Sequence, residues 1–231
     1  MDPNADVYVK VMSETSLGLE FQIHSPFGRA DIKTALHGRF NAFNVTAAVV
    51  AVTGLGFPFT EVANAASHLL PVDGRMQEVK GGSDIRVVVD YAHTPDALSS
   101  ALSALKQSCT GALWVVFGCG GDRDAGKRPE MGRIADSLAD QLVVTNDNPR
   151  SESPEMIAED ILVGITGSAC HVELDRGAAI RHAVLNARSG DTVLVAGKGH
   201  ENYQLVGKNK LDFSDVSSAA EALREREAAH A

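Results

Sequence analysis

Two kinds of hydrophobic pattern divide the chain. Apolar and polar residues alternate over residues 7–27 around a turn at 16–18, which predicts antiparallel strands. The run of small apolar residues at 45–52 predicts a helix that Asn44 caps and two later glycines end. A second helical pattern covers residues 60–70. The first part of the chain is therefore expected to contain strands followed by two helices.

Beyond residue 75, short apolar runs alternate with helical patterns, after a boundary rich in turn-forming residues at 71–75. The expected strands are 86–90, 113–117, 141–145, 171–174 and 192–196, and the expected helices are 95–106, 129–139, 154–165 and 177–187. A hairpin at the sheet edge over residues 203–213 and a last helix from Asp215 follow. This alternation predicts an α/β fold with a mostly parallel sheet and helices on both faces.

Composition narrows the class of protein. The 231 residues, 44% of them hydrophobic, fit a globular protein of one large or two modest domains. The net charge of -9 argues against nucleic acid or an anionic membrane as a partner. Three cysteines without CxxC spacing favour a reducing, cytoplasmic compartment, and no export signal or membrane-spanning run is recognisable. We expect a cytoplasmic monomer.

Four of the expected strands are each followed by a polar cluster. The clusters lie at residues 90–95, 118–123, 147–150 and 197–201. Because loops after parallel strands meet at one edge of a sheet, these clusters predict a single ligand site. In the first cluster, Asp90 and His93 offer an acceptor and a donor that suit a ribose or a base edge.

The second cluster also contains a GxxxxGK string at residues 121–127, after a strand and before a helix. A phosphate loop continues with Ser or Thr, whereas Arg128 stands here, and Asp122 and Asp124 give the loop the wrong charge for phosphate. A phosphate cradle is therefore the weaker interpretation. A GxGxxG fingerprint and an HExxH string are both missing, which disfavours a nicotinamide enzyme and a zinc protease.

The second, third and fourth clusters together carry charges of both signs. Arg123 and Arg150 can bind a carboxylate, and Glu201 can bind an ammonium group. Gly197 and Gly199 allow a ligand to approach the backbone closely. This combination suits an α-amino acid.

In this order the clusters resemble the Mur ligase family, within it the branch that adds meso-diaminopimelate. The strings that carry the resemblance are HGRFNAFN at 37–44, GRM at 74–76, DYAHTPDAL at 90–98, FGCGGDRD at 117–124, DNPR at 147–150 and GKGHE at 197–201. The resemblance covers nearly the whole chain. It implies a Rossmann-like amino-acid-binding domain at 75–231, preceded at 1–74 by the carboxy-terminal part of a central ATP-binding domain.

The activity that the resemblance implies is amide-bond formation in peptidoglycan synthesis. The amine of meso-diaminopimelate would be joined to the D-glutamate γ-carboxylate of UDP-MurNAc-L-Ala-D-Glu, after ATP has converted that carboxylate to an acyl phosphate. Activation is needed because a carboxylate is a poor electrophile, and Mg²⁺ would stabilise the developing charge.

The resemblance also implies two sets of site residues. Diaminopimelate is expected to contact Arg123, Asp147, Asn148, Pro149, Arg150, Gly197 and Glu201. ATP is expected to contact Asn41, Asn44, Arg75, Asp90 and His93. Within the first set, Arg150 and Asn148 would bind the distal carboxylate, and Gly197 and Glu201 the distal amine. No catalytic residue and no metal ligand is assigned within the chain.

The chain also departs from the family pattern. The family's phosphate loop and the modified lysine that helps to hold Mg²⁺ would lie upstream of residue 1, so residues 1–70 would be half a domain with exposed strand edges. We expect no ligase or ATPase turnover from this chain alone. The alternative is a free-standing module that binds a diamino acid without catalysis, and a third interpretation is a nucleotide-dependent oxidoreductase.

Overall fold

The computed structural model describes residues 5–15, 18–81, 84–167 and 170–230. The chain forms two compact units, Met1–Pro71 and Val72–Ala231. Each unit has a hydrophobic core of its own. The division lies close to the boundary expected at residues 74 and 75, and the assignment of the units to the two Mur ligase domains stays a prediction.

The first unit is a three-stranded antiparallel sheet with two helices packed on it. Its strands are β1 (Tyr8–Thr15), β2 (Gly18–Ser25) and β3 (Gly28–Thr34), in the order β1-β2-β3, and its helices are α1 (Arg39–Gly54) and α2 (Phe59–Ala66). The alternation predicted for this region is real, because Leu19, Phe21 and Ile23 on β2 all point into the core. Strand β3 was not predicted, since Ile32 is its only deeply buried large apolar residue.

The predicted start of α1 is wrong. The helix begins at Arg39, after Gly38 at a φ of 85°, so Asn44 lies inside it and caps nothing. Ser16 and Leu17 of the predicted turn lie outside the described residues. Gly18 begins β2 at a φ of 123°, and a Cβ there would stand 2.0 Å from the carbonyl oxygen of Thr34, so only glycine fits.

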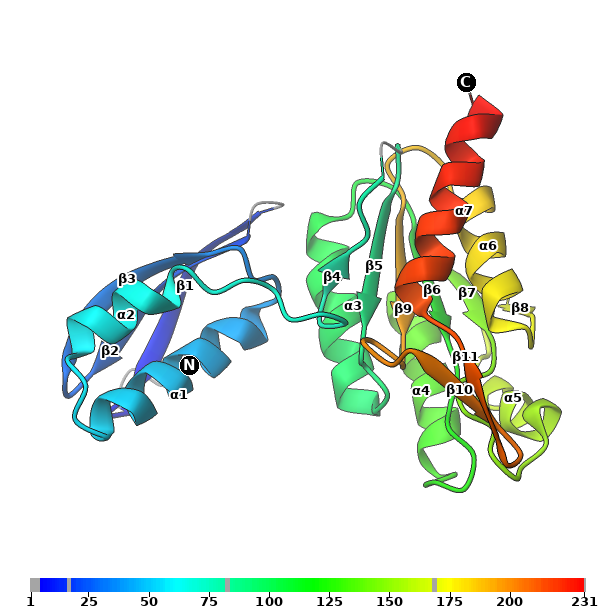
Figure 1. Ribbon diagram of the computed structural model, residues 1–231, viewed down its shortest axis with the longest axis horizontal. Coiled ribbons are helices and arrows are strands. Elements are labelled where there is room, and N and C mark those ends of the chain that lie inside the picture. The colour runs from blue at the N-terminus through cyan, green and yellow to red at the C-terminus, as the bar shows by residue number, and fades with distance from the viewer. Residues whose placement is uncertain (1–4, 16–17, 82–83, 168–169, 231) are drawn as a thin grey trace. The chain divides into compact units, whose positions relative to one another are not determined.

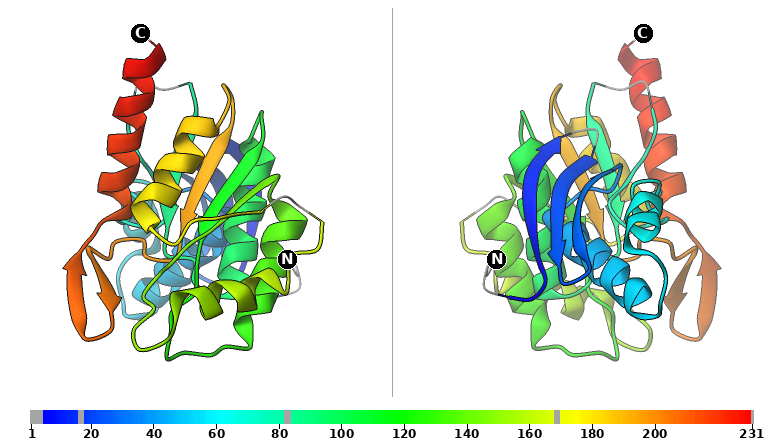
Figure 2. Two further views of the ribbon diagram at one scale, coloured as in Figure 1. Left: turned by 90° about the vertical axis from the view of Figure 1, so that its right-hand side faces the viewer. Right: turned by 90° about the vertical axis from the view of Figure 1, so that its left-hand side faces the viewer.

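The second unit contains a six-stranded sheet with helices on both faces. Its elements are β4 (Gln77–Glu78), β5 (Arg86–Asp90), α3 (Pro95–Ser108), β6 (Leu113–Phe117), α4 (Lys127–Leu138), β7 (Gln141–Val144), α5 (Pro154–Leu162), β8 (Cys170–Val172), α6 (Arg176–Asn186), β9 (Thr192–Ala196), β10 (Tyr203–Val206), β11 (Asn209–Asp212) and α7 (Asp215–His230). The strand order is β4-β5-β9-β6-β7-β8, with β4 antiparallel and the others parallel. Helices α3, α4 and α5 pack side by side, and α6 packs with α7 on the other face (Figures 1 and 2). The predicted α/β class is confirmed.

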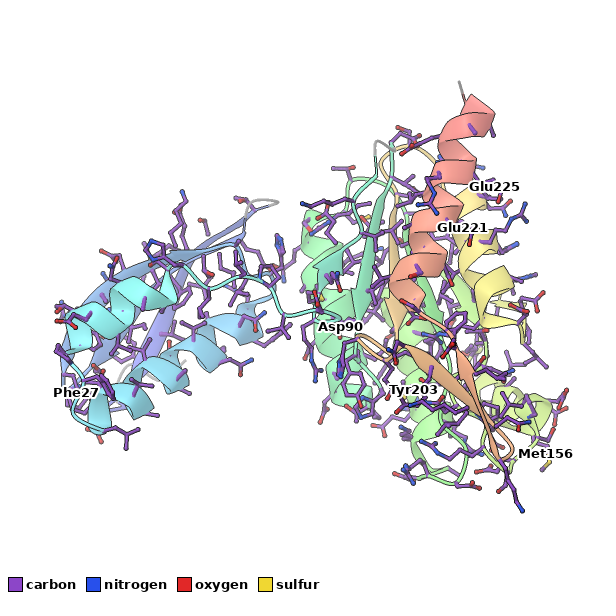
Figure 3. All side chains as sticks on the ribbon, viewed as in Figure 1. Phe27, Asp90, Met156, Tyr203, Glu221 and Glu225 are labelled. Carbon is purple, nitrogen blue, oxygen red and sulfur yellow. The ribbon has the colours of Figure 1, made fainter. Side chains whose placement is uncertain are left out.

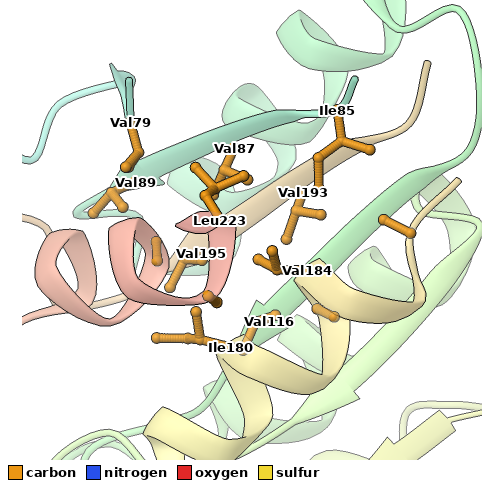
Figure 4. Close-up of a cluster of buried hydrophobic side chains, with 14 of the residues drawn as sticks. Val79, Ile85, Val87, Val89, Val116, Ile180, Val184, Val193, Val195 and Leu223 are labelled. Carbon is orange, nitrogen blue, oxygen red and sulfur yellow. The ribbon is translucent and has the colours of Figure 1, made fainter. Parts of the chain in front are cut away.

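Two neighbouring strands inside the sheet, β5 and β9, show why the apolar runs could be recognised in the sequence. Strand β9 is buried along its whole length, and β5 is buried over its last four residues, so both read as apolar runs rather than as alternating patterns. One face packs against α6 and α7, where Val87, Val193 and Val195 contact a cluster that includes Ile180 and Leu223 (Figure 4). This face of the sheet is thereby covered by one continuous hydrophobic core.

The hairpin is present but is not part of the sheet edge. Strands β10 and β11 form a separate two-stranded sheet, and a single bridge joins Val206 to Arg150. The backbone N–H of Arg150 donates to Leu205 O at 3.1 Å, and Gly207 N–H donates to Arg150 O at 2.7 Å. The hairpin therefore packs against the loop after β7, and the edge position belongs to β4, which the sequence did not predict. Within the part of the chain that the structure describes, every helix is too short or too polar to cross a bilayer.

Candidate functional site

A pocket of about 510 Å³ lies at the carboxyl ends of the parallel strands of the second unit. Its walls come from the loops after β5, β6, β7 and β9, from the start of α4 and from β10. The lining residues are Tyr91, His93, Thr94, Gly120, Arg123, Asp124, Lys127, Asp147, Asn148, Arg150, Gly197, Glu201 and Tyr203. Figure 3 draws these side chains with Tyr203 labelled. The edge of the sheet that the polar clusters predicted is therefore hollowed.

Two glycines let the loops after β6 and β7 lie directly on each other. A Cβ at Gly118 would stand 2.0 Å from Thr145 O, and one at Gly121 would stand 2.0 Å from Pro149 O. The N–H of Gly121 donates to Asn148 O at 2.9 Å. Any side chain at either position would force the two loops apart.

Arg150 is fixed at the pocket wall by its own backbone and by the neighbouring loop. Its φ is 51°, an uncommon conformation for a residue with a side chain. Its Nη1 donates to Gly121 O at 2.8 Å and to Asn148 O at 3.4 Å. Nε and Nη2 have no acceptor among the described residues, so they remain available to a carboxylate.

Asn148, Lys198 and Glu201 form a buried polar network. Asn148 is 4% exposed and Lys198 is fully buried. Lys198 Nζ lies 3.1 Å from both Asn148 Oδ1 and Glu201 Oε2, and Asn148 Nδ2 donates to the same Glu201 oxygen at 3.1 Å. One cation, one amide and one carboxylate are thus held together at the pocket wall.

Asp147 approaches the pocket beside Gly197. A Cβ at Gly197 would stand 2.6 Å from Asp147 Oδ2, and the φ of Gly197 is 122°, so the position requires glycine. The backbone oxygen of Asp147 accepts from Gln204 Nε2 at 2.8 Å, which joins the loop after β7 to β10. The carboxylate itself makes no hydrogen bond with the described residues and lines the pocket.

Arg176, the first residue of α6, lies under this edge of the sheet. It is paired with Asp215 at 2.7 Å, and it donates to Asn146 O at 3.1 Å and to Ala196 O at 2.9 Å. Ala196 is the last residue of β9, and Asn146 lies in the loop directly after β7, so one buried guanidinium joins the chain at the ends of both strands. Sequence reasoning did not identify Arg176, because its partner is 39 residues away.

The last residues of the GxxxxGK string, and Arg128 after it, bind other groups of the protein. Arg128 is buried and pairs with Glu152 at 2.8 Å and with Asp160 at 2.9 Å, which ties α4 to the chain around α5. Lys127 Nζ donates to His93 O at 2.6 Å, and Gly126 N–H donates to Asp124 Oδ1 at 2.9 Å. Where a phosphate loop has Ser or Thr, this chain has an arginine that is buried in ion pairs between elements. This disfavours the phosphate-cradle interpretation.

The structure gathers six of the seven expected diaminopimelate residues, all but Pro149, around the pocket. Arg123 lies at its exposed rim, where Nη1 donates to Asp122 O at 3.1 Å. Tyr91, Lys127 and Tyr203 also line the pocket, although no ligand contact was assigned to them from the sequence. Tyr203 lies on the hairpin, and no local pattern could have placed it beside the loop after β7.

The expected ATP residues are not gathered in the same way. Only His93 lines the pocket, with its Nδ1 2.7 Å from Tyr91 O. Asn41 and Asn44 lie on α1 in the first unit and are hydrogen-bonded to each other at 3.4 Å. Arg75 stacks on the ring of Tyr91, with its guanidinium carbon 4.5 Å from the ring centroid. A role in ATP binding stays a prediction for all five.

Asp90 has a local structural role. Its two carboxylate oxygens accept from the N–H groups of Met76 at 2.7 Å and Ala92 at 2.8 Å. Burial raises the pKa of this carboxyl above its ordinary value, although these N–H groups and the charge of Arg75 oppose the effect. Asp90 thus fixes the turn after β5 and the chain before β4. Across the described ranges, no three His, Cys, Asp or Glu side chains are arranged to hold a metal ion.

Comparison with known proteins identifies the family. Residues 74–199 match the family model described as Mur ligase, glutamate ligase domain. The diaminopimelate ligase of Chromobacterium violaceum, named UDP-N-acetylmuramoyl-L-alanyl-D-glutamate--2,6-diaminopimelate ligase, is 49% identical over 220 residues, which are 94% of this chain and 45% of that protein. The ligase of the same name from Gloeobacter violaceus is 49% identical over 226 residues, covering 97% and 46%. The chain therefore spans about half the length of the curated relatives it matches.

Solved structures agree. A diaminopimelate ligase of the same name superposes with a TM-score of 0.68 at 39% identity, over 100% of this chain and 47% of that one. The UDP-N-acetylmuramate-alanine ligase MurC of Thermotoga maritima superposes with a TM-score of 0.69 at 18% identity, over 100% and 47%, which shows the fold alone. The family match covers more than half of the chain and includes four of the strings on which the resemblance was based, those between GRM and DNPR. The chain belongs to the Mur ligase family.

Proposed function

We propose that this chain carries the amino-acid site of an ATP-dependent ligase that adds meso-diaminopimelate to UDP-MurNAc-L-Ala-D-Glu in peptidoglycan synthesis. The relatives with this reaction in their names, at 49% identity, support the proposal. The observation that carries it is that one pocket contains both a guanidinium, that of Arg150, whose Nε and Nη2 have no acceptor among the described residues, and the carboxylate of Glu201. The reaction is proposed for the cytoplasm, where the three free cysteines stay reduced.

The pocket wall complements one zwitterionic end of the diamino diacid. The distal carboxylate would receive hydrogen bonds from Arg150 Nε and Nη2 and from Asn148 Nδ2. The distal ammonium group would lie against Glu201, with Asp147 and the bare backbone of Gly197 beside it. Lysine has the distal ammonium group and lacks the distal carboxylate, so it would leave Arg150 unpaired, which is the physical basis of selection.

The role of these contacts in the reaction is positioning. With the distal end held, the other amine would be presented to the acyl phosphate of the second substrate. The amine nitrogen bonds to the γ-carbonyl carbon, inorganic phosphate leaves, and the amine loses its proton. Mg²⁺, when bound, would neutralise phosphate charge in this step. We propose that Arg75, Asp90 and His93, with Asn41 and Asn44 of the first unit, contact ATP.

The proposal is tested by calorimetric titration of the purified chain with meso-diaminopimelate and with lysine. Wild type should bind meso-diaminopimelate at least about tenfold more tightly. Arg150→Ala should weaken meso-diaminopimelate by about 2 kcal/mol, the lower end of the range for a paired interfacial charge, because Arg150 is only partly buried. Arg150→Lys should also lose affinity, since one ammonium cannot bind both Gly121 O and a bidentate carboxylate.

Arg133→Ala is the matched control, because Arg133 is an exposed arginine of α4 outside the pocket. It should leave both affinities unchanged. Equal losses for lysine and meso-diaminopimelate in Arg150→Ala, or none for either, would contradict the proposed function.

The alternative is a diamino-acid-binding module without catalysis. It has support in the fact that every pocket-lining residue belongs to the second unit. Under either function the purified chain alone is expected to release no phosphate from ATP, so the measurement is made on whatever protein carries this chain in the cell, given ATP and both substrates. Phosphate release that Arg150→Ala diminishes supports the ligase, and tight binding of meso-diaminopimelate without release supports the binding module.

A further inference from the structure

Lys198 is a buried cation at the pocket wall. Its side chain is 0% exposed, and buried lysines are rare unless their charge is compensated. Its Nζ lies 3.1 Å from Asn148 Oδ1 and from Glu201 Oε2, and 5.5 Å from the ring centroid of Tyr203. The ammonium group does not line the pocket, so its effect on a ligand must pass through these partners.

The first partner is Asn148, whose amide orientation Lys198 helps to determine. Asn148 Oδ1 accepts from Lys198 Nζ at 3.1 Å and from Leu205 N–H at 2.8 Å. Both groups can only donate, so the atom between them must be the amide oxygen. Asn148 Nδ2 then faces Glu201 and the pocket. One of its two N–H groups is used by Glu201, and the other has no acceptor among the described residues.

The second partner is Glu201, whose two oxygens become different. Oε2 accepts from both Lys198 Nζ and Asn148 Nδ2, each at 3.1 Å. Oε1 has no donor within the described part of the chain, and the side chain is 18% exposed at the pocket. Lys198 therefore offsets part of the charge of Glu201 and leaves one oxygen for a ligand ammonium group.

We propose that Lys198 is a positioning residue that sets the polarity of the amino-acid site, so that Asn148 Nδ2 meets the ligand carboxylate and Glu201 Oε1 meets the ligand ammonium group. The inference rests on the proposed function, because it assigns the two ends of a bound diamino diacid. Lys198 acts on specificity through Asn148 and Glu201 and touches no reacting atom.

Lys198→Met separates this role from a purely structural one. Methionine keeps a long unbranched side chain but removes the charge and both hydrogen bonds. Without Lys198, Asn148 loses one of the two donors that fix its amide, and Glu201 keeps an uncompensated charge that repels a carboxylate. The variant should lose at least about tenfold in affinity for meso-diaminopimelate and change less than about threefold for lysine, which has no distal carboxylate.

Lys210→Met is the matched control. Lys210 also lies over the ring of Tyr203, with Nζ 4.1 Å from the ring centroid. Unlike Lys198, it is exposed and lies outside the pocket. Its removal should leave both affinities and their ratio unchanged. The three proteins, each as the whole chain, are compared by calorimetric titration with meso-diaminopimelate and lysine, after thermal unfolding has shown that each is folded.

The outcomes separate the two levels of the proposal. Wild type that does not prefer meso-diaminopimelate contradicts the proposed function itself. A wild-type preference that Lys198→Met retains, or equal losses for both ligands in that variant, overturns the role of Lys198 and leaves the proposed function standing. A preference that shrinks in Lys198→Met alone supports it.

A crystal structure of the wild-type chain with meso-diaminopimelate decides the matter even if Lys198→Met does not fold. The ligand carboxylate is expected within hydrogen-bond distance of Asn148 Nδ2, and its ammonium group at Glu201 Oε1. A ligand ammonium group at Asn148, or a ligand carboxylate bonded directly to Lys198 Nζ, overturns the proposal.

Discussion

The buried pair between Arg176 and Asp215 gives the sharpest prediction about stability. Both side chains are 0% exposed and are joined by two hydrogen bonds, at 2.7 and 2.8 Å. Burial disfavours the charged guanidinium, but the carboxylate of Asp215 outweighs it and raises the pKa of Arg176. Arg176→Met removes the cation and leaves the carboxylate buried without a partner.

The expected loss follows from this geometry. Removing one partner of a buried pair costs about 3–5 kcal/mol, a large part of the about 5–15 kcal/mol by which a domain is stable. Adding Asp215→Leu should recover part of the loss, because no carboxylate is then stranded. Arg181 on the same helix is the control, since its pair with Glu225 on α7, labelled in Figure 3, is 58% and 44% exposed. Arg181→Met should cost less than about 1 kcal/mol.

Urea unfolding followed by tryptophan fluorescence measures these differences. Trp114 is the one tryptophan of the sequence and lies on β6, so its signal reports the second unit alone. That matters because a chain of two units need not unfold in one step. If Arg176→Met were no less stable than Arg181→Met, or if the double variant were less stable than Arg176→Met, the reasoning about the stranded carboxylate would be refuted.

Three further predictions concern the loops around the pocket. Gly121→Ala would place a Cβ 2.0 Å from a backbone oxygen of the loop after β7 and should cost at least about tenfold in meso-diaminopimelate affinity by titration, whereas Gly54→Ala, with open space around it, should cost nothing. A backbone N–H and Arg128 lower the pKa of Glu152, so its stabilising effect is present above the unfolded-state pKa of about 4.3 and is lost as the pH falls through the lower folded-state value. The difference in melting temperature between wild type and Glu152→Gln should therefore shrink as the pH is lowered from about 7 to about 3, and a constant difference would contradict this. Burial raises the pKa of the Cys119 thiol to about 12, so a thiol reagent at about pH 8 should leave it unmodified until the chain is unfolded.

The fold was predictable where burial is two-sided or strictly alternating. The apolar runs of β5 and β9 and the alternation in β2 are direct results of the faces they bury. Strands β3 and β4 were missed because their pairing depends on neighbours and not on their own composition. The hairpin was recognised from its turn, but its packing on the loop after β7 is a tertiary contact that carries no local signal.

The site was predictable to the extent that topology alone determines it. Parallel strands bring their following loops to one edge, so polar clusters after four strands had to meet, and six residues expected to contact diaminopimelate line one pocket. Arg176 and Lys198 could not be recognised in the same way. Each acts through partners that the chain supplies elsewhere, Asp215 for one and Asn148 for the other.

The residue expected to stabilise the second unit, Arg176, and the residue proposed to set its ligand selectivity, Lys198, both act at the carboxyl ends of β7 and β9. Arg176 donates to the carbonyl of Asn146, in the loop that supplies Asn148, and to that of Ala196, just before the loop that supplies Glu201. Lys198 then joins those two side chains across the gap between the loops. Because the network leaves only one Asn148 N–H and one Glu201 oxygen without partners in the described chain, a ligand meets donors and an acceptor whose positions are already fixed. The ordering entropy of these groups is thereby lost on folding and not on binding, which under the proposed function would let the pocket distinguish two amino acids that differ by one carboxylate.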